Sequence, residues 1–211
     1  MRHPLLLWLA VCAVWLVLVG AGCNLFEPDD PEPPSEQAIL PDYRTPDRTL
    51  DMIALALRDK ARTNGTSVYI GAFADSTAPD TPAYHHFFWP TDVAQSGVTP
   101  PADWGVSHEL NFYSKLLHLR GDEYQLIWLA DEENPDDTRE QRVDIHRHYE
   151  VVTETPDGTI TGTLALGFAD LTLVKGADGN WRVTIWSDRV DPAADPGADE
   201  VSLGRRRLSS P

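Results

Sequence analysis

The second half of the chain contains four β-strand patterns, and these constrain its fold more than any other feature. Residues 123–130, 141–155, 159–174 and 180–190 are rich in β-branched and aromatic side chains. The last three segments are joined by Pro156-Asp157-Gly158 and Asp178-Gly179-Asn180, which have the composition of tight hairpin turns. Three long strands joined by tight turns predict an antiparallel meander.

Helices are expected ahead of this sheet. The first begins at Thr45-Pro46-Asp47, because Thr caps a helix, Pro suits its first position and Asp favours its positive end. A second short helix is expected over 67–74, although a strand remains open there. A first strand is expected over 83–89, bounded by prolines.

A loop rich in Pro, Gly and Asp is expected to follow that strand. Ser107 is then expected to cap a further helix that ends at Gly121. The apolar spacing places four residues on its buried side: Leu110, Tyr113, Ser114 and Leu117.

This order of elements resembles the nuclear transport factor two-like superfamily, which includes SnoaL-like and ketosteroid-isomerase-like proteins. The resemblance rests on Thr45-Pro46-Asp47, Ala72-Phe73-Ala74-Asp75, Phe87-Phe88-Trp89 and the run from Asp178 to Asp188. It implies an α+β fold, a cystatin-like cone in which N-terminal helices pack on a strongly curved antiparallel sheet. This architecture hosts enzymes, binding modules and assembly domains, so the fold does not define the function.

The first 22 residues resemble a bacterial lipoprotein signal peptide. Arg2 and His3 precede an apolar run, and Gly20-Ala21-Gly22 precedes Cys23. The resemblance implies that Cys23 carries a lipid that anchors the protein to a membrane. Two alternatives remain open, an uncleaved spanning anchor and an ordinary cleaved signal, because the run approaches the ~17–25 residues of a spanning helix. All three readings export the domain to the bacterial cell envelope.

The rest of the chain divides into three parts. Residues 23–44 are acidic and rich in proline, which predicts an extended tether. Residues 45–192 form the cone domain, and residues 193–211 form a tail that is expected to be ordered only in part. The chain has 2 cysteines, Cys12 and Cys23, so the folded domain has no disulfide and no thiolate nucleophile.

The net charge of −16 argues against nucleic-acid binding. The chain carries 33 acidic residues against 17 Lys and Arg, and such a surface repels phosphate backbones. Its one basic cluster, Arg205-Arg206-Arg207, is too short and too close to the end to reverse this.

Acid–base chemistry has one set of candidate residues. One of His85 and His86 should face inward, because successive strand residues point to opposite faces. Near Asp92 or Asp188, an inward histidine would form a catalytic acid–base pair. A histidine that is simply part of the core is the commoner outcome. No nucleophile elbow, phosphate-binding loop or dinucleotide fingerprint is present, and we predict no cofactor.

Two other groups of residues are candidates for binding. His146 and His148 share one strand face and would supply two metal ligands, with Asp144 or Glu150 as a third. Alternation with apolar residues instead favours a solvated strand face, so we predict no metal. Tryptophans are candidates for lining a ligand pocket: Trp89, Trp128 and Trp186.

These observations favour a non-catalytic binding or interaction domain at the envelope. Its partner would be a small ligand or a protein, and a homodimer through the sheet is one form of this hypothesis. The alternative is an isomerase, dehydratase or hydrolase that uses an Asp–His pair in the cone pocket.

Overall fold

The computed structural model describes residues 38–58, 64–76, 81–118, 123–155, 157–190 and 201–209. The predicted signal 1–22, Cys23 and most of the tether 23–44 lie outside these ranges. Within the described residues, no helix has the length and apolarity needed to cross a membrane.

The first two described helices form the N-terminal part of the domain. Helix α2 spans Pro46–Arg58, which confirms the predicted start, and it buries Leu50, Ile53 and Leu57 on one face. Helix α3 spans Gly65–Gly71, which confirms a short helix where a strand had remained open. The end of the predicted tether packs against it, because Tyr43 donates a hydrogen bond to the carbonyl of Val68 (2.7 Å).

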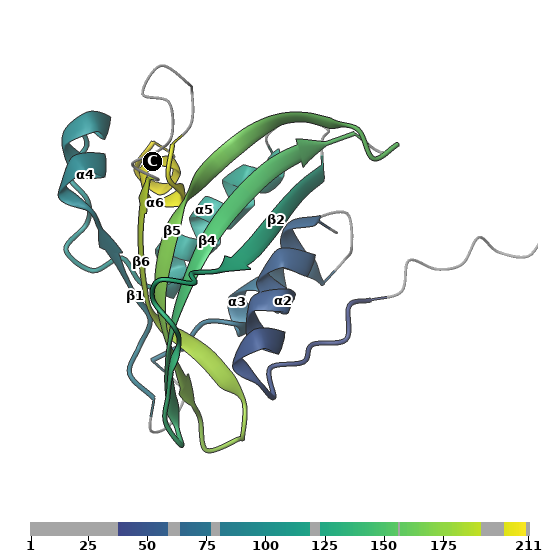
Figure 1. The fold of residues 1–211 in the computed structure, drawn as a ribbon, viewed down its shortest axis with the longest axis vertical. Coiled ribbons are helices and arrows are strands. Elements are labelled where there is room, and N and C mark those ends of the chain that lie inside the picture. Colours follow the sequence, from purple (N-terminus) through teal and green to yellow (C-terminus); the bar gives the residue numbers. More distant parts are fainter. Residues whose placement is uncertain are drawn as a thin grey trace, which may run out of the picture. The chain divides into compact units, whose positions relative to one another are not determined.

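The described strands form one curved sheet in the order β1-β6-β5-β4-β2 (Figure 1). Their bounds are His85–Phe88 for β1, Glu123–Ala130 for β2, Arg142–Glu154 for β4, Ile160–Lys175 for β5 and Trp181–Val190 for β6. The short β3, Asp137–Thr138, also pairs with β4. Strand β1 runs parallel to β6, and the other pairs are antiparallel. The predicted meander is therefore β4, β5 and β6.

The two faces of the sheet differ as strand alternation requires. On β4, Val143, Ile145 and Tyr149 are buried, whereas His146 and His148 are only half-buried on the opposite face. Register shifts interrupt the ladders between β4 and β5 and between β5 and β6. Such bulges increase the local bend of a sheet. In Figure 1, α2, α3 and α5 (Val106–His118) lie along one side of this curved sheet.

Helix α4, Pro90–Ser96, occupies the segment that was expected to be a loop. Its sequence carries helix signals that the surrounding Pro and Gly residues obscured. Pro90 is the first helical residue, and Gly97 ends the helix in the left-handed conformation, with φ 67°.

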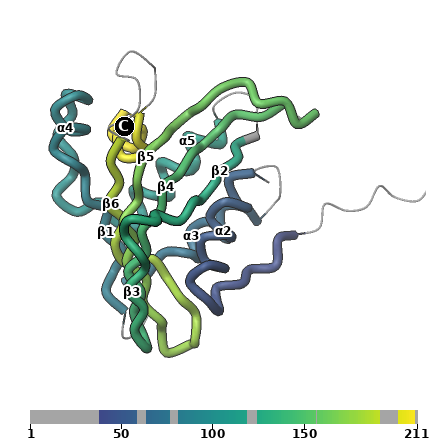
Figure 2. The backbone as a smooth tube through the Cα atoms, viewed as in Figure 1, coloured from purple at the N-terminus to yellow at the C-terminus, as the bar shows by residue number. Residues whose placement is uncertain are grey.

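The tail contributes helix α6, Leu203–Leu208, with Ser202 as its cap. The side chains of Leu203, Arg207 and Leu208 are buried against the domain. Helix α6 lies beside α4 at the same end of the sheet (Figure 2). Part of the tail therefore belongs to the packed domain.

The buried side expected for helix α5 is confirmed only in part: Tyr113 is buried and Leu117 packs half-buried against the core. Its buried residues are Glu109, Phe112, Tyr113 and Leu116, whereas Leu110 is 39% exposed. The expected side differs because the prediction used apolar residues alone, and this criterion does not select the buried Glu109.

Candidate functional site

The interior of the cone holds a buried cation between two carboxylates. Arg207 on α6 donates from Nη2 to Glu109 Oε1 (2.7 Å) and from Nη1 to Asp188 Oδ2 (2.9 Å). Its Nε lies 3.0 Å from Glu109 Oε2. All three side chains have 0% exposed surface. Arg207 comes from α6, Glu109 from α5 and Asp188 from β6, so this network joins α6 to the other two elements.

Glu109 also accepts hydrogen bonds from three aromatic residues. Tyr69 donates from 2.7 Å, Trp104 from 3.0 Å and Tyr84 from 3.3 Å. Burial raises the pKa of Glu109, but the charge and hydrogen bonds of Arg207, with the hydrogen bonds of Tyr69 and Trp104, outweigh burial and leave that pKa below its ordinary value. This carboxylate therefore stays ionised and has its acceptor positions filled.

Aromatic rings enclose the guanidinium of Arg207. Its Cζ lies 4.3 Å from the ring centroid of Trp186 and 5.0 Å from that of Phe112. A planar guanidinium is well suited to such contacts, because it attracts the π face while its edge donates hydrogen bonds.

A second acidic group lies where α6 begins. Asp188 Oδ1 accepts a hydrogen bond from the amide of Gly204 (2.6 Å), and Asp92 Oδ2 accepts one from Ser202 (2.7 Å). Burial raises the pKa of Asp188 to about 7, against the lowering effect of Arg207. Burial also raises the pKa of Asp92. Both acids thus hold α6 in position, through its cap and its first turn.

The expected Asp–His pair is not formed. His86 faces inward and is 2% exposed, whereas His85 lies on the opposite face of β1. Neither ring nitrogen of His86 has a hydrogen-bond partner among the described residues, so it is bonded to neither Asp92 nor Asp188. Burial lowers the pKa of His86 well below its ordinary value, and the charge of Arg207 adds to this effect.

The two candidate metal ligands take part in different contacts. His146 Nδ1 lies 2.7 Å from Asp170 Oδ1, whereas the ring of His148 packs on Phe168 with centroids 4.9 Å apart. In the part of the chain that the structure describes, no three His, Cys, Asp or Glu side chains are grouped as a metal site.

The three candidate tryptophans do not line one pocket. Trp186 faces the interior, and its ring centroid lies 5.8 Å from that of Trp128, whose indole donates to the carbonyl of Leu50 (3.3 Å). Trp89 is 38% exposed at the outer end of β1.

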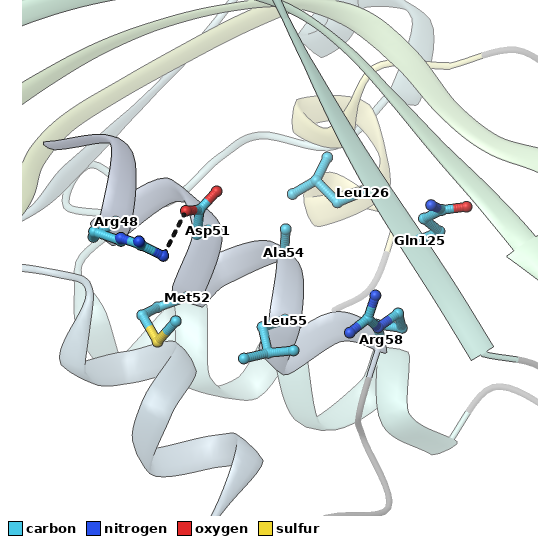
Figure 3. Close-up of a pocket in the computed structure, with 8 residues that line it drawn as sticks. All are labelled: Arg48, Asp51, Met52, Ala54, Leu55, Arg58, Gln125 and Leu126. Atoms are coloured by element: carbon cyan, nitrogen blue, oxygen red, sulfur yellow. Dashed lines mark ion pairs between the residues drawn. The ribbon is translucent and has the colours of Figure 1, made fainter. Parts of the chain in front are cut away.

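A cavity of about 310 Å³ lies elsewhere, between α2 and β2 (Figure 3). Arg48 and Asp51 form an ion pair at 3.7 Å beside it. The cavity contains none of the candidate residues; its lining is Arg48, Asp51, Met52, Ala54, Leu55, Arg58, Gln125 and Leu126. Its volume is at the lower end of the range of about 300–1,000 Å³ that small-molecule sites span.

The outer face of the sheet carries a continuous row of large side chains, one from each strand or its end. Paired positions join Leu129 to His148, His148 to Phe168 and Phe168 to Arg189. The guanidinium of Arg189 lies 4.5 Å from the ring centroid of Phe168 and 5.8 Å from that of Trp89. We call this set the outer row: Leu129, His148, Phe168, Arg189 and Trp89.

Sequence reasoning missed Glu109 and Arg207. Glu109 lies one turn before the buried Tyr113, but a choice based on apolar residues does not include a carboxylate. Arg207 belongs to the basic cluster Arg205-Arg206-Arg207, which we considered only as a nucleic-acid-binding patch. One signal in the sequence does indicate a helix here: Ser202 is a favourable helix cap. Leu203 follows it, four positions before Arg207, so an apolar residue and Arg207 lie on the same helix face.

Comparisons with known proteins concern the fold. No protein-family model matches the chain, and no curated protein matches its sequence. A cystatin-like protein of unknown function from Nostoc punctiforme is similar in structure, with 14% identity and a TM-score of 0.42 over 69% of this chain and 87% of that one. ActVI-ORFA from Streptomyces coelicolor has 11% identity and a TM-score of 0.47 over 66% and 90%.

A protein of unknown function from Mycobacterium tuberculosis is also similar, with 14% identity and a TM-score of 0.44 over 76% of this chain and 94% of that one. These identities and TM-scores carry no argument about this chain. By its own helices and its curved, mostly antiparallel sheet, the described part of the chain has the α+β cone architecture that the resemblance to the nuclear transport factor two-like superfamily predicted.

Proposed function

We propose that this protein is a non-catalytic interaction domain, held at the bacterial cell envelope by a lipid on Cys23, that binds a protein partner through the outer row. The partner is either another protein or a second copy of this chain. The observation that carries the proposal is the outer row itself, a band of aromatic, apolar and cationic side chains across the sheet.

The outer row has the composition of a protein-binding surface. Aromatic residues and Arg are enriched where proteins bind one another, and they supply most hot-spot residues. Leu129 is 53% exposed, and Phe87, next to the row on β1, is 51% exposed. A partner that covers these side chains would remove apolar surface from water at about 25 cal/mol per Å².

The interior supports a non-catalytic role. Its central carboxylate, Glu109, has its acceptor positions filled, and Arg207 occupies the space between it and Asp188. Among the residues that the structure describes, His86 has no acidic hydrogen-bond partner that would make it a base. A substrate that binds Glu109 and Asp188 at these oxygens would have to displace the buried guanidinium.

Site-specific photo-crosslinking in the protein's own cells tests the proposal. A benzophenone amino acid in place of Phe168 keeps an aromatic ring in the outer row. The matched control replaces Ile160, which is 59% exposed near the end of the same strand and outside the row. We expect protein adducts from position 168, either with another protein or with a second copy, and few from position 160. Absence of adducts at 168 would contradict the proposal.

One observation favours the alternative, an isomerase-, dehydratase- or hydrolase-type enzyme. The pKa of Asp188 is about 7, and a group with a pKa near the working pH is well suited to acid–base catalysis. This function requires an interior that solvent and substrate can enter. Diethyl pyrocarbonate labelling tests access, with the exposed His118 as internal reference. We expect His86 to stay unlabelled while His118 reacts; comparable rates at both would favour the enzyme.

A further inference from the structure

The interior contacts of Arg207 are those of a site for a guanidinium group. Nε and Nη2 face the two oxygens of Glu109, and Nη1 faces Asp188. This is the bidentate geometry that a planar guanidinium makes with a carboxylate, and an ammonium, as a single point charge, does not reproduce it. Aromatic rings at 4.3 and 5.0 Å add recognition of the planar cation.

The receptor side of this site is largely organised by elements other than α6. Glu109 is oriented by Tyr69 on α3, by Tyr84 before β1 and by Trp104 before α5. None of these donors depends on the helix that brings Arg207. A binding site whose groups are fixed in advance loses less entropy when a ligand enters, and this favours affinity.

The buried carboxylates of the interior are compensated by a cation that α6 supplies. Glu109, Asp188 and Asp92 are buried together around α6, and Arg207 is the cation that contacts the first two. His86 is buried nearby, but burial holds its pKa low, so it remains neutral near pH 7. Without a guanidinium, Glu109 would be a buried and uncompensated charge.

We propose that the cone interior is a guanidinium-binding site, which the chain fills with its own Arg207 and which accepts a free alkylguanidinium when that side chain is removed. The ligand class is an arginine side chain or a small molecule ending in the same group. This site is separate from the outer row, so the inference goes beyond the proposed function and does not depend on it.

Chemical rescue of Arg207→Ala tests the proposal in the full chain. This change removes the side-chain atoms beyond Cβ, and ethylguanidinium has those same non-hydrogen atoms. Butylammonium has the same charge and a similar length but lacks the planar fork. Both are added as chloride salts and the melting temperature is followed by circular dichroism. With a Kd of about 1 mM, about 10 mM ethylguanidinium should raise the melting temperature of the variant by about 3–6 °C.

The unchanged protein serves as the control, because its site is already filled and ethylguanidinium should leave its melting temperature unchanged. Equal rescue by butylammonium, or no rescue by either cation, would overturn the proposal. If Arg207→Ala does not fold by itself, the same titration starts from the unfolded chain. Folding that appears with ethylguanidinium and not with butylammonium supports the site, and a chain that stays unfolded with both refutes it.

Discussion

Glu109→Gln is the most direct test of the buried network, because it removes one charge with almost no change in size. The carboxylate accepts from Arg207, Tyr69, Tyr84 and Trp104 at 2.7–3.3 Å. A glutamine has one acceptor oxygen and an NH₂ group that only donates. At least one of these donors would then face another donor, and the Arg207 guanidinium would lose its main counter-charge.

The expected loss of stability is large. Breaking a fully buried ion pair by removing one partner costs about 3–5 kcal/mol, because it leaves an uncompensated buried charge. Both side chains here have 0% exposed surface, so solvent screening does not reduce this figure. A typical domain has an unfolding free energy of about 5–15 kcal/mol, so the variant would lose a large part of it. The melting temperature should fall by about 6–20 °C.

Urea unfolding followed by tryptophan fluorescence measures this loss, because Trp104 and Trp186 both contact the network. Glu140→Gln is the matched control, since Glu140 is exposed, and its effect should stay within about 0.5 kcal/mol. Adding Arg207→Met to Glu109→Gln should recover part of the stability, because it removes the unpaired cation. A loss below about 1 kcal/mol for Glu109→Gln would refute the reasoning.

Three further predictions concern other parts of the chain. The folded-state pKa of Asp188, about 7, exceeds its unfolded value of about 3.9, so the folded state holds an extra proton between these values and the stability from this group is lost as pH rises through that window. The unfolding free energy of Asp188→Asn minus that of the wild type should therefore rise by up to roughly 4 kcal/mol between about pH 4 and pH 8. Urea unfolding measures this difference, and a difference that stays constant with pH would contradict the prediction. Gly204→Ala should destabilise the domain by about 1–3 kcal/mol in spite of better helix propensity, because its Cβ would lie 2.5 Å from Asp188 Oδ1, whereas Gly105→Ala, with 3.6 Å to the nearest atom, is the control. Cys23→Ser should abolish incorporation of radiolabelled palmitate and release the protein from membranes, and a variant that stays membrane-bound would indicate a spanning helix instead.

The sheet could be predicted because its signals are local. Alternation on β4 separated the buried Val143 and Ile145 from the half-buried His146 and His148, and the turn at Asp178-Gly179-Asn180 set the hairpin between β5 and β6. The interior could not be predicted, because its key contact joins Glu109 to Arg207, 98 residues apart. Local periodicity carries no information about such a distant pair. An acidic residue such as Glu109 does not fit the apolar pattern of a buried helix face, and its burial is explained only by its partner Arg207.

The burial of this pair also bears on which function the fold serves. A substrate that binds the oxygens of Glu109 and Asp188 held by Arg207 has to displace this guanidinium, and breaking the buried pair costs about 3–5 kcal/mol. Such a cost corresponds to an open fraction between about 1 in 160 and 1 in 5,000 molecules. An enzyme that works through these carboxylates would have its activity reduced to about that fraction, unless its substrate contributed a cation that replaced Arg207. Leu129 and Trp89 of the outer row are 53% and 38% exposed in the folded domain, so a partner that binds them does not have to open the interior. This difference is the reason we propose binding through the sheet.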